Sequence, residues 1–324
     1  MITTEETGAL ARTLQDEGTG LRWTEAGAAE FAERLGRLAD GRLAGRVRVS
    51  VDPAELVFPL SLPAPDPAAQ AAEFRRVADA MRAALGEAAF LGTHGFAAPF
   101  GRTTDPRWGR PFLRWRMAET TLELRAGAEG PEAVLQPSAP WETWYQSVGR
   151  GFVGVRESSG LSLDHPRHEV PTDWDDLRLT LAAFLRTLPA VTTALGIPQN
   201  LPLYGRIPGT DTPLLFVLVS DARLFVEFTA YEIAEAARGA GAAALGWPPR
   251  PTAGLLPAEL DGEAPWLLDA GGPGEVDAGA AADLIVRTAR AAGVTRAADL
   301  ILGGEAEFRH PFRFAFPGLA LPVG

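Results

Sequence analysis

The spacing of the apolar residues changes along this chain in a regular way, from the three- and four-residue intervals of a helix to the two-residue intervals of a strand. Phe74, Val77 and Met81 lie on one face of a predicted helix. The next regular segments, 112–117 and 120–125, alternate as the two strands of a β-hairpin do. Such helices and strands must bury their apolar faces against each other, so the sequence predicts an α/β fold of the α+β type with mainly antiparallel sheets.

The same order of elements recurs later in the chain. Leu177, Leu181 and Leu188 have helical spacing, and the segments 214–219 and 223–229 alternate as a second hairpin. We interpret the two parts as diverged copies of one helix-plus-hairpin unit with helices packed on its strands. The alternative is coincidence, because a helix followed by a hairpin is common enough to recur by chance.

The remaining periodic segments extend both units. Helices are predicted at 5–15, after Thr24, and at 231–240, 279–292 and 296–302, and strands at 47–51, 56–60, 133–136, 152–156 and 312–316. Pro189 is expected to end or kink the second long helix, and 246–274 is expected to form a packed loop. The predicted domain organisation is an N-terminal subdomain, 1–148, and a C-terminal subdomain, 149–324, which carries the additional C-terminal helices.

The balance of charge limits the classes of partner. The formal net charge is −11 at pH 7. General affinity for nucleic acid or for an anionic membrane requires a strong cationic field, so we expect no membrane partner, consider nucleic acid an improbable one, and favour a protein or peptide with a basic face. The sequence predicts neither a transmembrane nor a secretory segment, which favours a cytoplasmic protein.

Two chemically useful side chains are absent, because the chain has no cysteine and all 30 of its basic residues are arginine. High-GC codon usage explains the exclusive use of arginine, and selection against surface amines is the alternative. Disulfides, thiolate sites and lysine-dependent mechanisms are thereby excluded. Neither G-x-S-x-G nor G-x-G-x-x-G occurs. The sequence predicts no cofactor and favours a non-catalytic protein.

One segment carries residue types that bind metals. Asp164, His165, His168 and Glu169 lie within six residues, and two imidazoles with a carboxylate are ligands that zinc accepts. The segment is bounded by prolines and has no recognised ligand spacing. The alternative is a solvated, charged loop, which the missing spacing favours.

A second segment interleaves guanidinium groups with indole rings. It contains Arg107, Trp108, Arg110, Arg114 and Arg116, which are residue types that bind phosphates, acidic peptides or single-stranded nucleic acid. Strand alternation predicts a different role for part of it, with Trp115 in the core and the arginines of the opposite face paired with acids. The second interpretation fits the alternation better.

Aromatic residues cluster just before a glycine-rich segment at 149–154. Trp141, Trp144 and Tyr145 supply large, stiff surfaces of the kind that dominate protein interfaces. Such residues also fill the seam between subdomains, and we favour that interpretation because tryptophan is mostly buried in folded proteins.

These observations predict a non-catalytic intracellular protein that binds a protein or peptide, of the chaperone, immunity-protein or adaptor type. The prediction follows from the acidic composition and from the absence of any local catalytic motif. Two alternatives are a metal-dependent hydrolase that uses His165 and His168, and an anion or nucleic-acid binder that uses residues 107–116.

Overall fold

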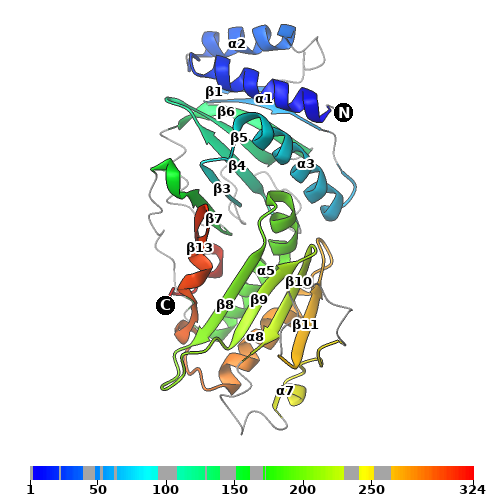
Figure 1. The fold of residues 1–324 in the computed structure, drawn as a ribbon, viewed down its shortest axis with the longest axis vertical. Coiled ribbons are helices and arrows are strands. Elements are labelled where there is room, and N and C mark those ends of the chain that lie inside the picture. Colours follow the sequence, from blue (N-terminus) through cyan, green and yellow to red (C-terminus); the bar gives the residue numbers. More distant parts are fainter. Residues whose placement is uncertain are drawn as a thin grey trace.

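A computed structural model describes residues 3–21, 23–38, 48–51, 54–61, 64–93, 108–127, 130–138, 151–160, 171, 173–229, 241–251 and 264–324. The fold is mixed α+β, with one antiparallel sheet of nine strands and one of five (Figure 1). The predicted fold class is confirmed at this level.

The larger sheet has the order β1-β2-β6-β5-β4-β3-β7-β14-β13, and all neighbouring strands are antiparallel. Its strands are β1 (Arg48–Val51), β2 (Ala54–Pro59), β3 (Phe90–Thr93), β4 (Pro111–Arg116), β5 (Thr120–Gly127), β6 (Gly130–Pro137), β7 (Val153–Arg156), β13 (Phe308–Arg309) and β14 (Phe312–Ala315). The sheet contains strands from both predicted subdomains, and the division at residue 148 stays a prediction.

The smaller sheet has the order β11-β10-β9-β8-β12, also with antiparallel neighbours. Its strands are β8 (Gln199–Gly205), β9 (Leu215–Ser220), β10 (Arg223–Phe228), β11 (Trp266–Gly271) and β12 (Leu300–Leu302). The predicted hairpin at 214–219 and 223–229 is therefore confirmed as β9 and β10.

The described residues form six α-helices: α1 (Thr4–Gly18), α2 (Glu25–Leu38), α3 (Pro67–Leu85), α5 (Trp174–Leu195), α7 (Gly241–Ala244) and α8 (Ala278–Ala291). Short 3-10 turns lie at Glu157–Ser159, Ala297–Asp299, Gly304–Glu307 and Pro317–Leu319. In Figure 1, α1 and α3 pack against the larger sheet, and α5 and α8 lie behind the smaller one. Within the described segments, no helix has the length and apolar character needed to cross a membrane.

Local capping explains where the two longest helices begin and end. Asp66 accepts a hydrogen bond from the amide of Ala69 at the start of α3, and Asp173 accepts one from Asp176 at the start of α5. Each helix ends at a glycine with positive φ, Gly86 or Gly196. These signals are local, so the sequence predicts both helices well.

Both sheets contain a four-stranded antiparallel meander that follows a long helix. In the larger sheet α3 precedes β3-β4-β5-β6, and in the smaller sheet α5 precedes β8-β9-β10-β11. Each meander is extended beyond its first strand by a later strand, β7 beside β3 and β12 beside β8. The shared order is consistent with a duplication, which stays a prediction.

One predicted helix is wrong. The segment 296–302 forms a 3-10 turn and then β12, because Leu300 and Leu302 are buried where the chain pairs with β8. Pro189 does not end the second long helix, which continues to Leu195, and a kink at Pro189 stays a prediction. Pro189 has no N–H to donate within the helix. Close to it, the hydroxyl of Thr192 donates to the carbonyl of Leu188, and that of Thr193 donates to the carbonyl of Pro189.

Strand pairing accounts for the other differences. The sequence predicts neither β3 nor β8, and β11 lies in the segment 246–274 that is predicted as a packed loop. Trp247 is buried there and stacks on Phe228, which agrees with the predicted packing. The predicted edge strand at 312–316 is wrong in its position, because β14 lies between β7 and β13. The predicted helix at 231–240 lies outside the described residues.

One hydrophobic cluster runs through both sheets and the helices between them. It includes Phe58 and Leu124 from the larger sheet, Leu185 from α5, Leu203 from the smaller sheet and Ile285 from α8. The two sheets therefore share a core that α5 connects.

We expect Ala222→Gly to stabilise the protein. Asp221 and Ala222 form the tight turn between β9 and β10 with φ values of 47° and 60°, a conformation that strains alanine and suits glycine. The free energy of unfolding, measured by denaturant titration, is expected to rise by about 1 kcal/mol. Ala72→Gly on the exposed side of α3 is the control and is expected to lower it by about 0.5–1 kcal/mol. Equal losses in both variants would refute the turn assignment.

Candidate functional site

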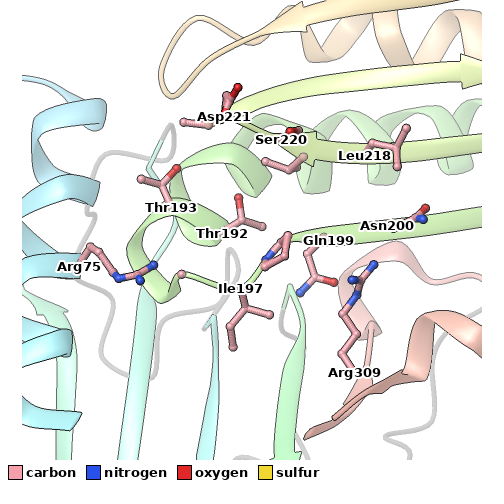
Figure 2. A pocket seen from close by; sticks show the side chains of 14 residues that line it. Arg75, Thr192, Thr193, Ile197, Gln199, Asn200, Leu218, Ser220, Asp221 and Arg309 are labelled. Atoms are coloured by element: carbon pink, nitrogen blue, oxygen red, sulfur yellow. The ribbon is translucent and has the colours of Figure 1, made fainter. Parts of the chain in front are cut away.

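A pocket of about 570 Å³ lies where α3, the end of α5, the smaller sheet and the edge of the larger sheet meet (Figure 2). Its wall therefore contains residues from segments that are far apart in the sequence. Its polar and charged lining includes Arg75, Thr193, Gln199, Asn200, Asp221 and Arg309. The volume falls within the range of about 300–1,000 Å³ that is typical of ligand pockets.

Gln199 is the most unusual residue of this pocket. Its side chain is 2% exposed, and among the described residues neither its amide nitrogen nor its amide oxygen has a hydrogen-bond partner. It lies at the start of β8, on the same face as the buried Leu201 and Leu203. Leaving a buried polar group unbonded costs about 1–3 kcal/mol. A buried amide in this state needs a partner from outside the chain, and an ordered water or a ligand can supply it.

Arg309 brings a positive charge to the same pocket. It lies on β13, and Figure 2 shows its guanidinium reaching toward β8, where Gln199 and Asn200 lie. Among the described residues no acid forms an ion pair with Arg309, and burial lowers the pKa of this guanidinium. The Oδ1 atom of Asn200 is also buried without a hydrogen bond. The pocket thus collects a cation and amide groups whose bonding capacity is unused.

The other polar side chains are satisfied or lie on the rim. Arg75 forms an ion pair of 2.7 Å with Asp79, and its guanidinium covers Gly196 so closely that a Cβ atom there would lie 1.5 Å from Nη1. The hydroxyl of Thr193 donates to the carbonyl of Pro189. Asp221 adds a carboxylate at the turn after β9. The hydroxyl of Thr193 therefore has a structural role at the end of α5.

The sequence prediction missed this pocket. Gln199 and Arg309 are separated by more than one hundred residues and belong to different sheets. No local motif joins them. The one available signal is a glutamine on the otherwise apolar inward face of a strand, which becomes visible only after β8 is recognised.

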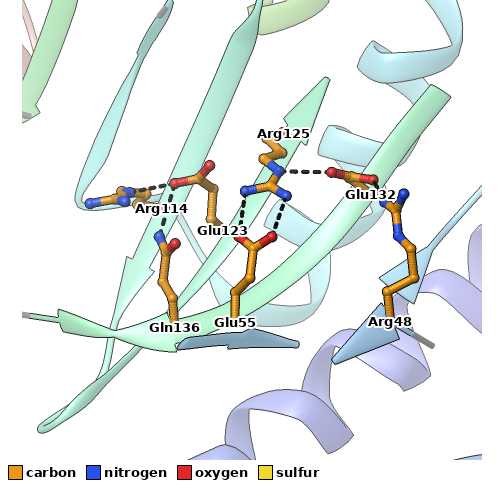
Figure 3. Close-up of polar contacts among 7 residues, drawn as sticks. All are labelled: Arg48, Glu55, Arg114, Glu123, Arg125, Glu132 and Gln136. Carbon is orange, nitrogen blue, oxygen red and sulfur yellow. Dashed lines mark hydrogen bonds and ion pairs between the residues drawn. The ribbon is translucent and has the colours of Figure 1, made fainter. Parts of the chain in front are cut away.

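The structure places Arg114, a predicted binding residue, inside the protein. Its Nε atom lies 2.6 Å from Glu123 Oε2 on the neighbouring strand, and both side chains are at most 2% exposed (Figure 3). Gln136 donates a second hydrogen bond of 3.1 Å to the same oxygen. Trp115 faces the opposite side of β4 and is buried in the core. This geometry agrees with the alternative in which the arginine pairs with an acid.

The polar network continues along the same face of the larger sheet. Arg125 binds Glu55 through both terminal nitrogens and Glu132 through Nε, and Arg48 also pairs with Glu132 (Figure 3). Burial lowers the pKa of Arg125, but the hydrogen bonds and charges of these two glutamates outweigh it and raise the pKa above its usual value. Such a network joins β1, β2, β4, β5 and β6.

The remaining described residues of the arginine and tryptophan segment are dispersed. Trp108 is 3% exposed and packs edge-on against Phe74, with a ring-centroid distance of 6.0 Å. Arg110 is half-buried, and burial lowers its pKa. Arg116 has an exposed side chain. The role of these residues in binding stays a prediction.

Several predicted site residues lie outside the described residues: Arg107, Trp141, Trp144, Tyr145, Asp164, His165 and His168. The interface and metal-site hypotheses for them remain predictions. Within the part of the chain that the structure describes, no group of three or more His, Cys, Asp or Glu side chains is placed to hold a metal ion.

No family model matches the chain, and no curated protein or solved structure matches it. The pocket is therefore interpreted from the chemistry of its own side chains.

We expect Gln199→Leu to stabilise the protein, because leucine removes two unbonded polar atoms from a buried position. The free energy of unfolding is expected to rise by about 1–2 kcal/mol in denaturant titrations. Gln136→Leu is the matched control. This glutamine is equally buried but donates to Glu123, so its loss is expected to cost about 1–3 kcal/mol. Destabilisation by Gln199→Leu would show that its amide is bonded in the folded protein.

We also expect Arg114→Met to be severely destabilising, by about 3–5 kcal/mol, because it leaves the buried carboxylate of Glu123 without its cation. The double variant Arg114→Met/Glu123→Leu removes both charges and is expected to recover most of this loss. Urea unfolding of both variants measures the difference. A single variant no less stable than the double variant would contradict a structural role for this ion pair.

Proposed function

We propose that the protein is a non-catalytic binding protein that holds a segment of a protein or peptide in the pocket between its two sheets. The observation that carries the proposal is the buried, unbonded amide of Gln199 in a pocket of about 570 Å³. A ligand with polar groups would satisfy this amide, and the apolar wall around it would bury the rest of the ligand.

The hydrogen-bonding groups and apolar lining of the site support a peptide ligand. A strand offers both hydrogen-bond donors and acceptors along its main chain, and Gln199 offers one group of each kind. Leu218 and Ile197 give the wall apolar surface beside these polar groups. The pocket is built on β8, β9 and the end of α5, which are rigid elements of the shared core and suit a preformed site.

The wider proposal follows the composition of the chain. We propose a duplicated α+β scaffold of the chaperone, immunity-protein or adaptor type in the cytoplasm. The recurring helix and four-stranded meander support the duplication. A net charge of −11 supports a partner with a basic face around the bound segment.

The proposal is tested by filling the pocket. Asn200→Trp places a large ring at the pocket wall on β8, and Phe216→Trp places the same ring on β9 outside it. A random peptide library is selected against the immobilised wild-type protein, and the enriched peptides are labelled for fluorescence anisotropy. Asn200→Trp is expected to weaken their binding about tenfold or more, because the tryptophan occupies the space of the ligand.

The Phe216→Trp variant controls for a general effect of a new tryptophan on the sheet and is expected to bind as the wild type does. The proposal fails if selection enriches no peptide over an empty surface. It fails equally if the enriched peptides bind Asn200→Trp and the wild type with the same dissociation constant.

A further inference from the structure

The unused bonding groups of the pocket define the chemistry of what they would bind. Gln199 has an NH₂ group and a carbonyl oxygen, both buried and both without partners. Exchanging the nitrogen and the oxygen of this amide leaves the same two groups unbonded, one donor and one acceptor. A complementary ligand must therefore present an acceptor and a donor close together.

Arg309 determines the sign of the ligand charge. It is a permanently charged side chain that is partly removed from water, and no described acid neutralises it. A cation in this position gains from an anion that replaces its lost hydration. Arg75 adds little to this attraction because Asp79 already pairs with it at 2.7 Å.

We propose that the pocket binds a carboxylate that is accompanied by a peptide N–H, with Arg309 and the Gln199 NH₂ group donating to the carboxylate and the Gln199 carbonyl accepting from the N–H. This inference rests on the proposed peptide-binding function and specifies the part of the peptide that is recognised. The planar fork of a guanidinium matches the two oxygens of a carboxylate. Both a free peptide C-terminus and an Asp or Glu side chain carry a carboxylate near a main-chain N–H.

The charges around the pocket favour a carboxylate over a phosphate. A phosphate monoester carries a charge of about −1.5 to −2 at neutral pH. Within the described segments the pocket offers one cation without an acid partner, Arg309, and the carboxylate of Asp221 also lines it. A singly charged anion therefore matches the site better than a doubly charged one.

The experiment measures the thermal unfolding temperature of the full chain in the presence of defined probes. Three pools of random, N-acetylated pentapeptides are compared: one with a free C-terminus and no acidic residue, one amidated with a single Asp or Glu, and one amidated without acidic residues. Inorganic phosphate is a fourth probe. We expect the first or second pool to raise the unfolding temperature of the wild type by about 2 °C or more. Which of the two does so identifies the source of the carboxylate.

Two pocket variants and one control assign the effect to the site. Arg309→Gln removes the charge, and Gln199→Leu removes both amide groups, so both are expected to lose the shift. For Gln199→Leu, the unfolding temperature without peptide is expected to rise, although the peptide no longer shifts it. Arg313→Gln removes an exposed positive charge from the neighbouring strand β14 and is expected to keep the full shift.

The remaining outcomes separate the two proposals. An equal shift from the amidated pool without acids, unchanged in Arg309→Gln, would overturn the carboxylate inference and leave peptide binding in place. A shift from phosphate but from no peptide pool would overturn both the carboxylate and the peptide. No shift from any probe would also overturn both, and a carboxylate shift that persists in Arg309→Gln would place the carboxylate elsewhere.

Discussion

Helix α5 is buried on every side near its C-terminal end. The packing of the two sheets into one core depends on this burial. From Leu188 to Leu195 every side chain except that of Thr193 is buried, and the helix contacts α3, α8 and strands of both sheets. Small residues make this possible. Ala190 and Ala194 allow close neighbours, and Gly109 lies so near Val191 that a Cβ atom would be 2.4 Å from its methyl carbon. A helix buried in this way holds both layers of strands in one core.

The pocket follows from the way in which α5 ends. Gly196 turns the chain with a φ of 67°, and β8 begins at Gln199. Arg82 of α3 donates to the carbonyl of Leu195 at 2.8 Å, which satisfies an acceptor that the helix end leaves free. The smaller sheet thus starts beside α3 and beside the edge of the larger sheet. The space between them becomes a pocket that residues from both sheets line.

Buried polar side chains of this protein differ in whether they are hydrogen-bonded. In the larger sheet Glu123 accepts hydrogen bonds from Arg114 and from Gln136, and strand pairing places Arg114 opposite Glu123. This network stabilises the fold only as a unit, because removing one member leaves a buried charge without its partner. In the pocket, Gln199 has the same side chain as Gln136 and the same burial but no partner. The two glutamines therefore differ: the amide of Gln136 is used within the fold, and no described residue bonds that of Gln199.

The sequence by itself determined the local elements: the capped starts of α3 and α5, their glycine ends, and the alternation that forms β9 and β10. It determined these because capping, left-handed turns and periodicity involve residues only a few positions apart. The tertiary structure alone decided that 296–302 becomes β12, that β14 lies inside the larger sheet, and that Gln199 and Arg309 share a pocket. Strand pairing and side-chain partners across the sheets depend on which distant segments meet, and no local pattern in the chain encodes that choice.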